Sequence, residues 1–199
     1  MSAALASVLQ YRPRRSRADA TAWLGMIIFL ASWSMLFAAL FAVYGVLRLR
    51  AESWPPPDCP RLPLLLPGAN TIALAASSLA LQSALRSARL GRLAAILPAA
   101  LAALALGMVF FGGQIALWMQ LWGSGLRLQS GAFASVFYSL TAFHAIHVLV
   151  GLGALAWVVA RAAKGAFGPT RHVGLRLWTS YWHFVGAIWV VLYVTVFAL

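Results

Sequence analysis

The sequence predicts an all-α membrane protein, a bundle of five transmembrane helices. Hydrophobic residues make up 63% of the 199 residues and charged residues 9%, whereas soluble proteins average about 45–50% and about 25%. Five apolar segments are close to or longer than the ~20 residues that a helix needs to cross a membrane. Prolines and glycines lie between these segments, where they separate one helix from the next.

The predicted spans follow one another with short connectors. In chain order they cover residues 23–47, 69–85, 93–121, 132–160 and 177–199. The first is a full-length span that follows several arginines and has no small-residue cleavage site, so we expect it to stay in the membrane. The second follows a proline-rich, extended connector, and Asn70-Thr71 marks its expected start. Pro98 falls in the opening turns of the third, where a proline costs least.

The basic residues predict the orientation of the bundle. The formal net charge is +12, with 15 lysines and arginines against three acids. Eleven basic residues fall before the first span or in the second and fourth connectors, and four in the other two: Arg48, Arg50, Arg61 and Arg127. The positive-inside rule therefore places the N-terminus in the cytoplasm and the C-terminus outside. Residues 1–22 become a cytoplasmic N-terminal segment and residues 23–199 the five-helix transmembrane domain.

The same charges exclude a nucleic-acid partner, because they form short clusters between apolar runs and not one continuous basic face. On the predicted cytoplasmic side they suit lipid headgroups as well as orientation. The residues that could contact an anionic headgroup there are Arg161, Arg171, His172 and Arg176. Six tryptophans near the predicted span ends suggest an aromatic belt at the membrane surface: Trp54, Trp118, Trp122, Trp178, Trp182 and Trp189.

Histidines inside the apolar segments are the candidate functional residues, since polar groups at membrane depth are costly. His144 and His147 are three residues apart and so share a helix face. Together with His183 they could ligate haem or a metal. We favour a structural role, in which each imidazole bonds a hydroxyl, Gln114 or a backbone carbonyl and joins two helices. Gln114 follows Gly112-Gly113, where close helix approach would let its amide bond across the contact.

Several classes of site are absent from the sequence. The single cysteine, Cys59, excludes an internal disulfide and a multi-cysteine metal centre. There is no phosphate-binding glycine loop, and all three acids, Asp19, Glu52 and Asp58, lie outside the spans. A proton pump or proton-coupled transporter ordinarily needs a carboxylate within the membrane. We therefore expect neither catalytic residues nor proton transport by this chain alone.

Six motifs, in order over nearly the whole chain, resemble subunit III of the haem–copper oxidases in its five-helix bacterial form. The first is the run from Trp23 to Ser32. The others are Trp54-Pro55-Pro56-Pro57, Asn70-Thr71 with Ser77-Ser78, Gln114 with Trp118, the run from Thr141 to Val148 around the two histidines, and Tyr181-Trp182-His183-Phe184-Val185 with Trp189.

The resemblance implies a non-catalytic accessory subunit of a respiratory terminal oxidase, in the cytoplasmic (inner) membrane of a bacterium. It implies direct packing against catalytic subunit I and a complex with subunit II and small subunits. Haem and copper are expected in those partners and not on this chain, which would bind phospholipid and support oxygen reduction. The family motif assigns structural roles to Gln114, His144, His147, Tyr181, Trp182 and His183.

The chain departs from the family where carboxylates are usual, at Trp33, Leu117, Arg176 and Gly186. We expect a glutamate restored at position 33 to be unpaired and to lower assembly. Other readings stay open at this point. They are an accessory subunit of a nitric oxide reductase, a membrane cytochrome that binds haem through its histidines, a small transporter and a free-standing lipid scaffold.

Overall fold

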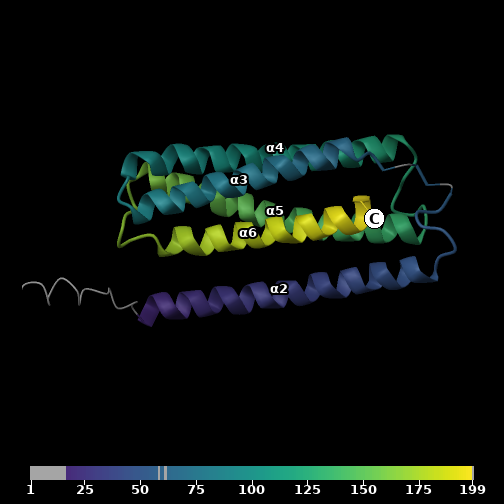
Figure 1. Ribbon diagram of the computed structural model, residues 1–199, viewed down its shortest axis with the longest axis horizontal. Coiled ribbons are helices and arrows are strands. Elements are labelled where there is room, and N and C mark those ends of the chain that lie inside the picture. The colour runs from purple at the N-terminus through teal and green to yellow at the C-terminus, as the bar shows by residue number, and fades with distance from the viewer. Residues whose placement is uncertain (1–16, 58, 61, 199) are drawn as a thin grey trace, which may run out of the picture.

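The computed structural model describes residues 17–57, 59–60 and 62–198. Five long helices run side by side along the long axis, and no strand occurs in this part of the chain (Figure 1). Their bounds are α2 (Arg17–Arg50), α3 (Leu65–Arg89), α4 (Ile96–Gly123), α5 (Ala132–Ala163) and α6 (Val173–Tyr193), with a 3₁₀ turn, η1 (Leu93–Ala95), before α4 and a π-helical turn, η2 (Val194–Ala198), after α6. The all-helical prediction is confirmed.

Four of these helices are long and apolar enough to span a membrane: α2, α4 with η1, α5 and α6 with η2. The remaining helix, α3, has 25 residues but is less apolar. Two of its polar side chains, Asn70 and Ser77, are buried and point inward. A helix that uses its polar face to bond its neighbours gives a weak apolar signal along the sequence.

Helix α3 extends beyond the predicted span 69–85 at both ends. It begins at Leu65, before the Asn70-Thr71 pair that was expected to start it. Pro67 is tolerated within the first turn, where backbone N–H groups have no partner inside the helix. At the other end of the chain, α2 already begins at Arg17, inside the predicted segment 1–22. Residues 1–16 of that segment lie outside the described residues.

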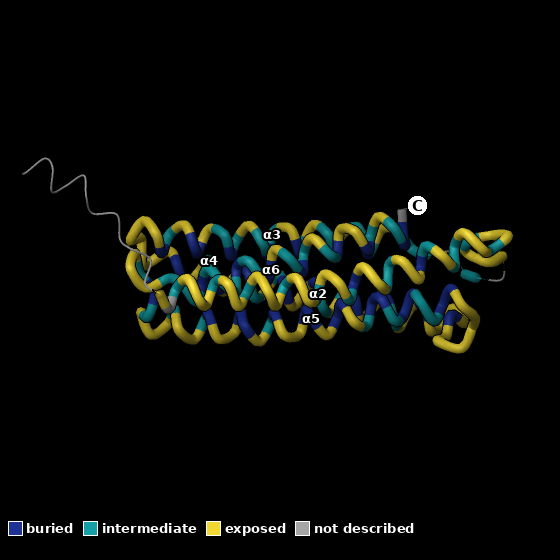
Figure 2. Tube along the Cα trace, turned by 90° about the horizontal axis from the view of Figure 1, so that it is seen from below, coloured by how far each residue is buried: buried dark blue, intermediate teal, exposed yellow. Residues whose placement is uncertain are grey.

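The core lies among α3, α4, α5 and α6, and α2 packs mainly against α5 and α6. In the tube view most of α2 is exposed (Figure 2). Its inward stripe has helical spacing and consists of Trp23, Met26, Leu30, Trp33, Phe37, Phe41 and Tyr44, of which only Phe37 and Tyr44 are buried. The opposite face of α2 is apolar and open, with Met35 76% exposed.

The basic residues collect at one end of the bundle, which we call the basic end. There α2 and α6 begin, α3 and α5 end and the chain turns into α4 (Figure 1). Its described basic residues are Arg17, Arg86, Arg89, Arg92, Arg161, Lys164, Arg171 and Arg176. Arg48, Arg50 and Arg127 lie toward the opposite end. The grouping agrees with the predicted asymmetry of the connectors.

Candidate functional site

The Tyr181-Trp182-His183 triplet of α6 bonds two neighbouring helices. The Tyr181 hydroxyl donates to the His147 carbonyl of α5 at 3.0 Å. The Trp182 indole N–H donates to the Ser77 hydroxyl of α3 at 3.0 Å, and His183 Nε2–H donates to Gln82 Oε1 of α3 at 3.2 Å. Consecutive residues of a helix point about 100° apart, so three in a row reach different neighbours.

Trp182 occupies the centre of the bundle. Its side chain is fully buried. A Cβ added at Gly151 of α5 would lie 2.5 Å from Trp182 Cζ3. A Cβ added at Gly107 of α4 would lie 2.9 Å from Leu152 Cδ2 and 3.0 Å from Trp182 Cζ2. Ser77, which accepts its N–H, donates in turn to the Ala103 carbonyl of α4 at 2.6 Å. Trp182 therefore connects α3, α4, α5 and α6.

Two further indoles bond hydroxyls across helices. Trp189 donates to Thr71 at 2.9 Å, and Trp118 donates to Thr141 at 3.2 Å. Trp182 and Trp189 are both fully buried, so the prediction that they belong to a surface aromatic belt is wrong. A tryptophan satisfies its one N–H with a single buried hydroxyl, which lets it serve as a core residue.

The sequence also predicts close helix approach at five glycines, Gly107, Gly112, Gly113, Gly151 and Gly153, and neighbouring side chains lie close at three of them. Gly107 and Gly151 face Trp182, and Gly113 leaves room for the Asn70 side chain. Gly112 and Gly153 have nothing within 4 Å of an added Cβ, so the prediction fails there.

His144 and His147 lie in the aromatic interior between α5 and its neighbours. The His144 ring stacks on Trp189 with centroids 5.4 Å apart and also contacts Phe37 and Phe110. His147 Nδ1–H donates to the Phe143 carbonyl at 2.5 Å. Both rings are buried, and neither nitrogen of His144 has a hydrogen-bond partner among the described residues. His147 bonds a backbone carbonyl as predicted, but that carbonyl belongs to its own helix, so the bond does not join two helices. The bonds predicted for His144 are wrong.

Gln114 is also buried, and within the described part of the chain neither its Oε1 nor its Nε2 has a hydrogen-bond partner. The prediction that this amide bonds across a glycine contact is wrong. The polar group placed against the glycine pair is instead Asn70 of α3, at Gly113.

The three histidines are not assembled as a ligand set. His183 lies on an exposed face beside α3, whereas His147 contacts Trp33 and Phe37 of α2. Within the described part of the chain, no three histidine, cysteine or acidic side chains come close enough to hold a metal ion. A haem ligated jointly by His144, His147 and His183 does not fit this arrangement.

Trp33 packs edge-on against His147, with ring centroids 3.8 Å apart. No described residue forms a hydrogen bond with His147 Nε2. A glutamate at position 33 would therefore stand near an imidazole, so the expectation that it would be unpaired does not agree with the geometry. Of the other three departures, Leu117 is buried on α4, Gly186 lines a small pocket between α3 and α6, and Arg176 lies over the Trp23 ring of α2.

We expect Trp33→Glu to reduce assembled protein much less than the double variant Trp33→Glu/His147→Leu. An isolated acid at membrane depth costs about 2.5–3.5 kcal/mol, and the imidazole can bond it. The yield of folded protein after gel filtration in detergent measures both, with His147→Leu alone as the control. Equal losses in the single and the double variant would show that the imidazole does not reach the acid.

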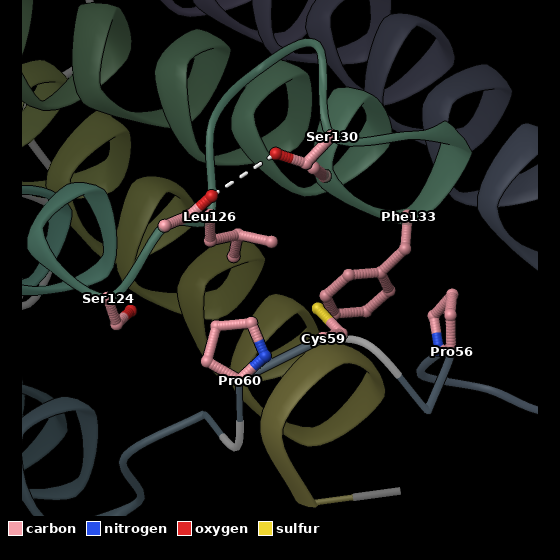
Figure 3. Close-up of a pocket in the computed structure, with 9 residues that line it drawn as sticks. Pro56, Cys59, Pro60, Ser124, Leu126, Ser130 and Phe133 are labelled. Atoms are coloured by element: carbon pink, nitrogen blue, oxygen red, sulfur yellow. Dashed lines mark hydrogen bonds between the residues drawn. The ribbon is translucent and has the colours of Figure 1, made fainter.

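At the end opposite the basic end, the tryptophan of the Trp54-Pro55-Pro56-Pro57 motif anchors the first connector. Its indole N–H donates to the Tyr44 hydroxyl at 3.0 Å, and that hydroxyl donates to the Thr195 carbonyl at 3.0 Å. A pocket of about 370 Å³ lies beside this connector, between Pro56, Cys59 and Phe133 (Figure 3). Burial raises the pKa of the Cys59 thiol, which lowers its reactivity.

Of the four residues predicted to contact a headgroup, two share a pocket at the basic end and the other two make separate contacts. Arg161 and Arg171 line one pocket of about 370 Å³, together with Asp19 and Trp157. Arg161 also lies over the Trp157 ring, 5.6 Å from its centroid. His172 Nδ1–H donates to the Gly168 carbonyl at 3.2 Å. Arg176 stacks on Trp23 of α2 at 4.6 Å.

The motif residues thus form bonds between the helices along most of the bundle. The sequence of the described helices also matches a known protein family. The family model described as Cytochrome c oxidase subunit III matches residues 17–199. The chain belongs to the cytochrome c oxidase subunit III family. The predicted resemblance is confirmed.

Three relatives within this subunit III family give the extent of the similarity. Cytochrome c oxidase subunit 3 of Synechocystis sp. is 35% identical over 176 residues, 88% of this chain and 74% of the relative. That of Thermostichus vulcanus is 34% identical over 177 residues, 88% of this chain and 86% of the relative. The probable cytochrome c oxidase subunit 3 of Nocardia farcinica is 35% identical over 173 residues, 87% of this chain and 85% of the relative.

The subunit III bundle also uses residues to which sequence reasoning gave no role. Ser77 and Thr71 accept indole N–H groups, and Gln82 accepts from His183. Ser77 and Thr71 stood within recognised motifs, so a search for hydroxyls opposite the tryptophans would have found them. Gln82 lies outside every motif, and only the packing of α3 on α6 brings it to His183.

Proposed function

We propose that this chain is a non-catalytic accessory subunit of a respiratory terminal oxidase, which packs on catalytic subunit I and supports its reduction of oxygen. Subunit II and small subunits complete the complex, and haem and copper reside in those partners. The match to the subunit III family over residues 17–199 carries this proposal. The polar motif residues support it, because Tyr181 donates to the His147 carbonyl of α5 and Trp182 donates to Ser77 of α3, and both bonds join helices.

The oxidase is favoured over the nitric oxide reductase alternative by the names of the relatives, which are cytochrome c oxidase subunits. The membrane is then the cytoplasmic membrane of a bacterium. The chain crosses it five times, with the N-terminus in the cytoplasm. The collection of arginines at the basic end supports this orientation, and the position of α3 alongside α4 and α6 supports a fifth span (Figure 1).

Purification of the complex through a tag on this chain tests the proposal. Haem absorption, oxygen uptake and a large polytopic partner in the eluate are the expected result. An eluate that holds this chain without a haem-bearing partner would overturn it and would leave the scaffold or the transporter. Partner chains of a nitric oxide reductase would instead identify the alternative assembly.

The pocket of Arg161 and Arg171 is the proposed site for an anionic phospholipid headgroup. Two guanidinium groups and an indole line it, and basic residues near a membrane surface contribute about 1 kcal/mol each to binding anionic lipid. Asp19 lines the same pocket and reduces its positive potential. The pocket suits a phosphate at the level of the predicted cytoplasmic surface.

We expect Arg161→Gln/Arg171→Gln to weaken retention of anionic phospholipid by up to about 30-fold, because two such contributions are removed. Lipid phosphorus per chain after delipidation, followed by mass spectrometry of the retained lipids, measures the change. Arg127→Gln, at the opposite end, is the matched control. Similar lipid retention in the double variant and the control would exclude this pocket as the site.

A further inference from the structure

An exposed polar pair on the surface of the bundle is not explained by the internal packing. His183 of α6 donates to Gln82 of α3 at 3.2 Å. The His183 side chain is exposed, and that of Gln82 is partly exposed. The pair leaves the second ring nitrogen of His183 and the amide N–H groups of Gln82 available for further bonds.

The pair lies below the membrane surface. His183 is seven residues from Arg176 along α6, and Gln82 is four residues from Arg86 and seven from Arg89 along α3. At about 1.5 Å per residue, His183 lies roughly 10 Å and Gln82 roughly 6 Å from the nearest arginine of its own helix, toward the middle of the bundle. Arginine side chains near helix ends extend toward the headgroups, so both polar groups lie in the outer part of the hydrocarbon core, which is about 30 Å thick.

Lipid is a poor cover for such a pair. Hydrocarbon offers no hydrogen bonds, and histidines within membrane spans almost always face protein or a water-filled cavity. The other open faces of the bundle are different in kind. Met35 on α2 and Met108 and Val109 on α4 are exposed apolar side chains that lipid can cover without cost.

The surface next to the pair has small side chains that would let another transmembrane helix come close. A pocket of about 130 Å³ between α3 and α6 is lined by Thr71, Ala75, Ser78, His183, Gly186 and Ala187, among others. Small residues and hydroxyls of this kind characterise contacts between transmembrane helices, because they let two backbones come near and bond.

We propose that this face of α3 and α6, here called the Gln82–His183 face, is covered by a transmembrane helix of another oxidase subunit. That helix places a hydrogen-bonding side chain at His183 or Gln82 and lies over Gly186 and Ala187. The inference rests on the proposed function and deepens it, since it assigns the surface through which the subunit joins its complex.

Side-chain replacement in the purified complex tests the bond. Hydrogen bonds between membrane helices contribute up to about 1.7 kcal/mol, so we expect His183→Leu to lower retention of this chain in the complex by about 3- to 10-fold during a detergent wash. His183→Asn, which keeps a donor and an acceptor, should remain within about twofold of the wild type. If the face meets lipid, His183→Leu will leave retention unchanged or raise it, and the proposal fails.

A photo-crosslinking residue at Ala187 gives a second and independent measurement. Ala187 is exposed at the rim of the pocket, and an adduct with another subunit is expected in the intact complex. Adducts with lipid alone, in a complex that contains haem and consumes oxygen, would overturn the proposed face and leave the proposed function standing. Absence of any haem-bearing partner from the wild-type complex would overturn both.

Discussion

Trp182→Leu should destabilise the subunit by about 3–5 kcal/mol, the range for large-to-small changes of a buried aromatic residue. The indole lies fully buried beside Gly107 and Gly151. Its loss leaves a cavity between four helices and removes the N–H that donates to Ser77. Ser77 still donates to the Ala103 carbonyl. The loss of packing around the indole therefore accounts for most of the lost stability, and the Ser77 hydroxyl keeps a hydrogen bond. Thermal unfolding in detergent measures the change.

Trp157→Leu is the matched control, because Trp157 is 45% exposed and its replacement opens no internal cavity. We expect it to change the free energy of unfolding by less than about 1 kcal/mol. Trp182→Phe should fall between the two, since a phenyl ring fills part of the space but lacks the donor. Equal stabilities of Trp182→Leu and Trp157→Leu would contradict the central position assigned to Trp182.

Gly151→Val should destabilise the same contact from the other side. An added Cβ at Gly151 would lie 2.5 Å from Trp182 Cζ3, a distance that forces the ring or α5 to move. Overpacking of a rigid core costs about 1–3 kcal/mol and at times more. Gly153→Val, two residues along α5, is the control, because nothing lies within 4 Å of its added Cβ.

The two changes should also compensate. In Trp182→Leu/Gly151→Val the smaller side chain vacates the space that valine needs, so the combined loss in stability should be clearly below the sum of the single losses. Residues in contact commonly show coupling of about 0.5–3 kcal/mol. Simple additivity, measured by thermal unfolding of all four proteins, would show that the Gly151 and Trp182 positions are independent.

The sequence was sufficient to predict the helices and the family, because apolar length and the order of six motifs are local signals. It predicted α3 at the correct place but too short, since Pro67-Gly68 and Arg86 bound its apolar run. The direction of each side chain could not be predicted. Trp182 and Trp189 look like interfacial tryptophans along the sequence, and only the crossing of α6 with α3 shows that serine and threonine hydroxyls accept their N–H groups.

The candidate site was predicted as a list of residues but not as an arrangement. His144, His147 and His183 form one apparent set in the sequence, yet the fold places two in the aromatic interior and one on the Gln82–His183 face. The contact between His147 and Trp33 could not be predicted from the sequence either. Trp33 and His147 are far apart in sequence and meet only because α2 packs on α5.

The most direct test of the account is to find where the haem resides. The complex is purified through a tag on this chain, the chain is then released with stronger detergent, and absorption spectra of both fractions are recorded. We expect all haem absorption to stay with the remaining complex and the released chain to be colourless. A haem band that follows this chain would make its histidines ligands and would contradict a non-catalytic subunit held together by Trp182, Tyr181 and His147.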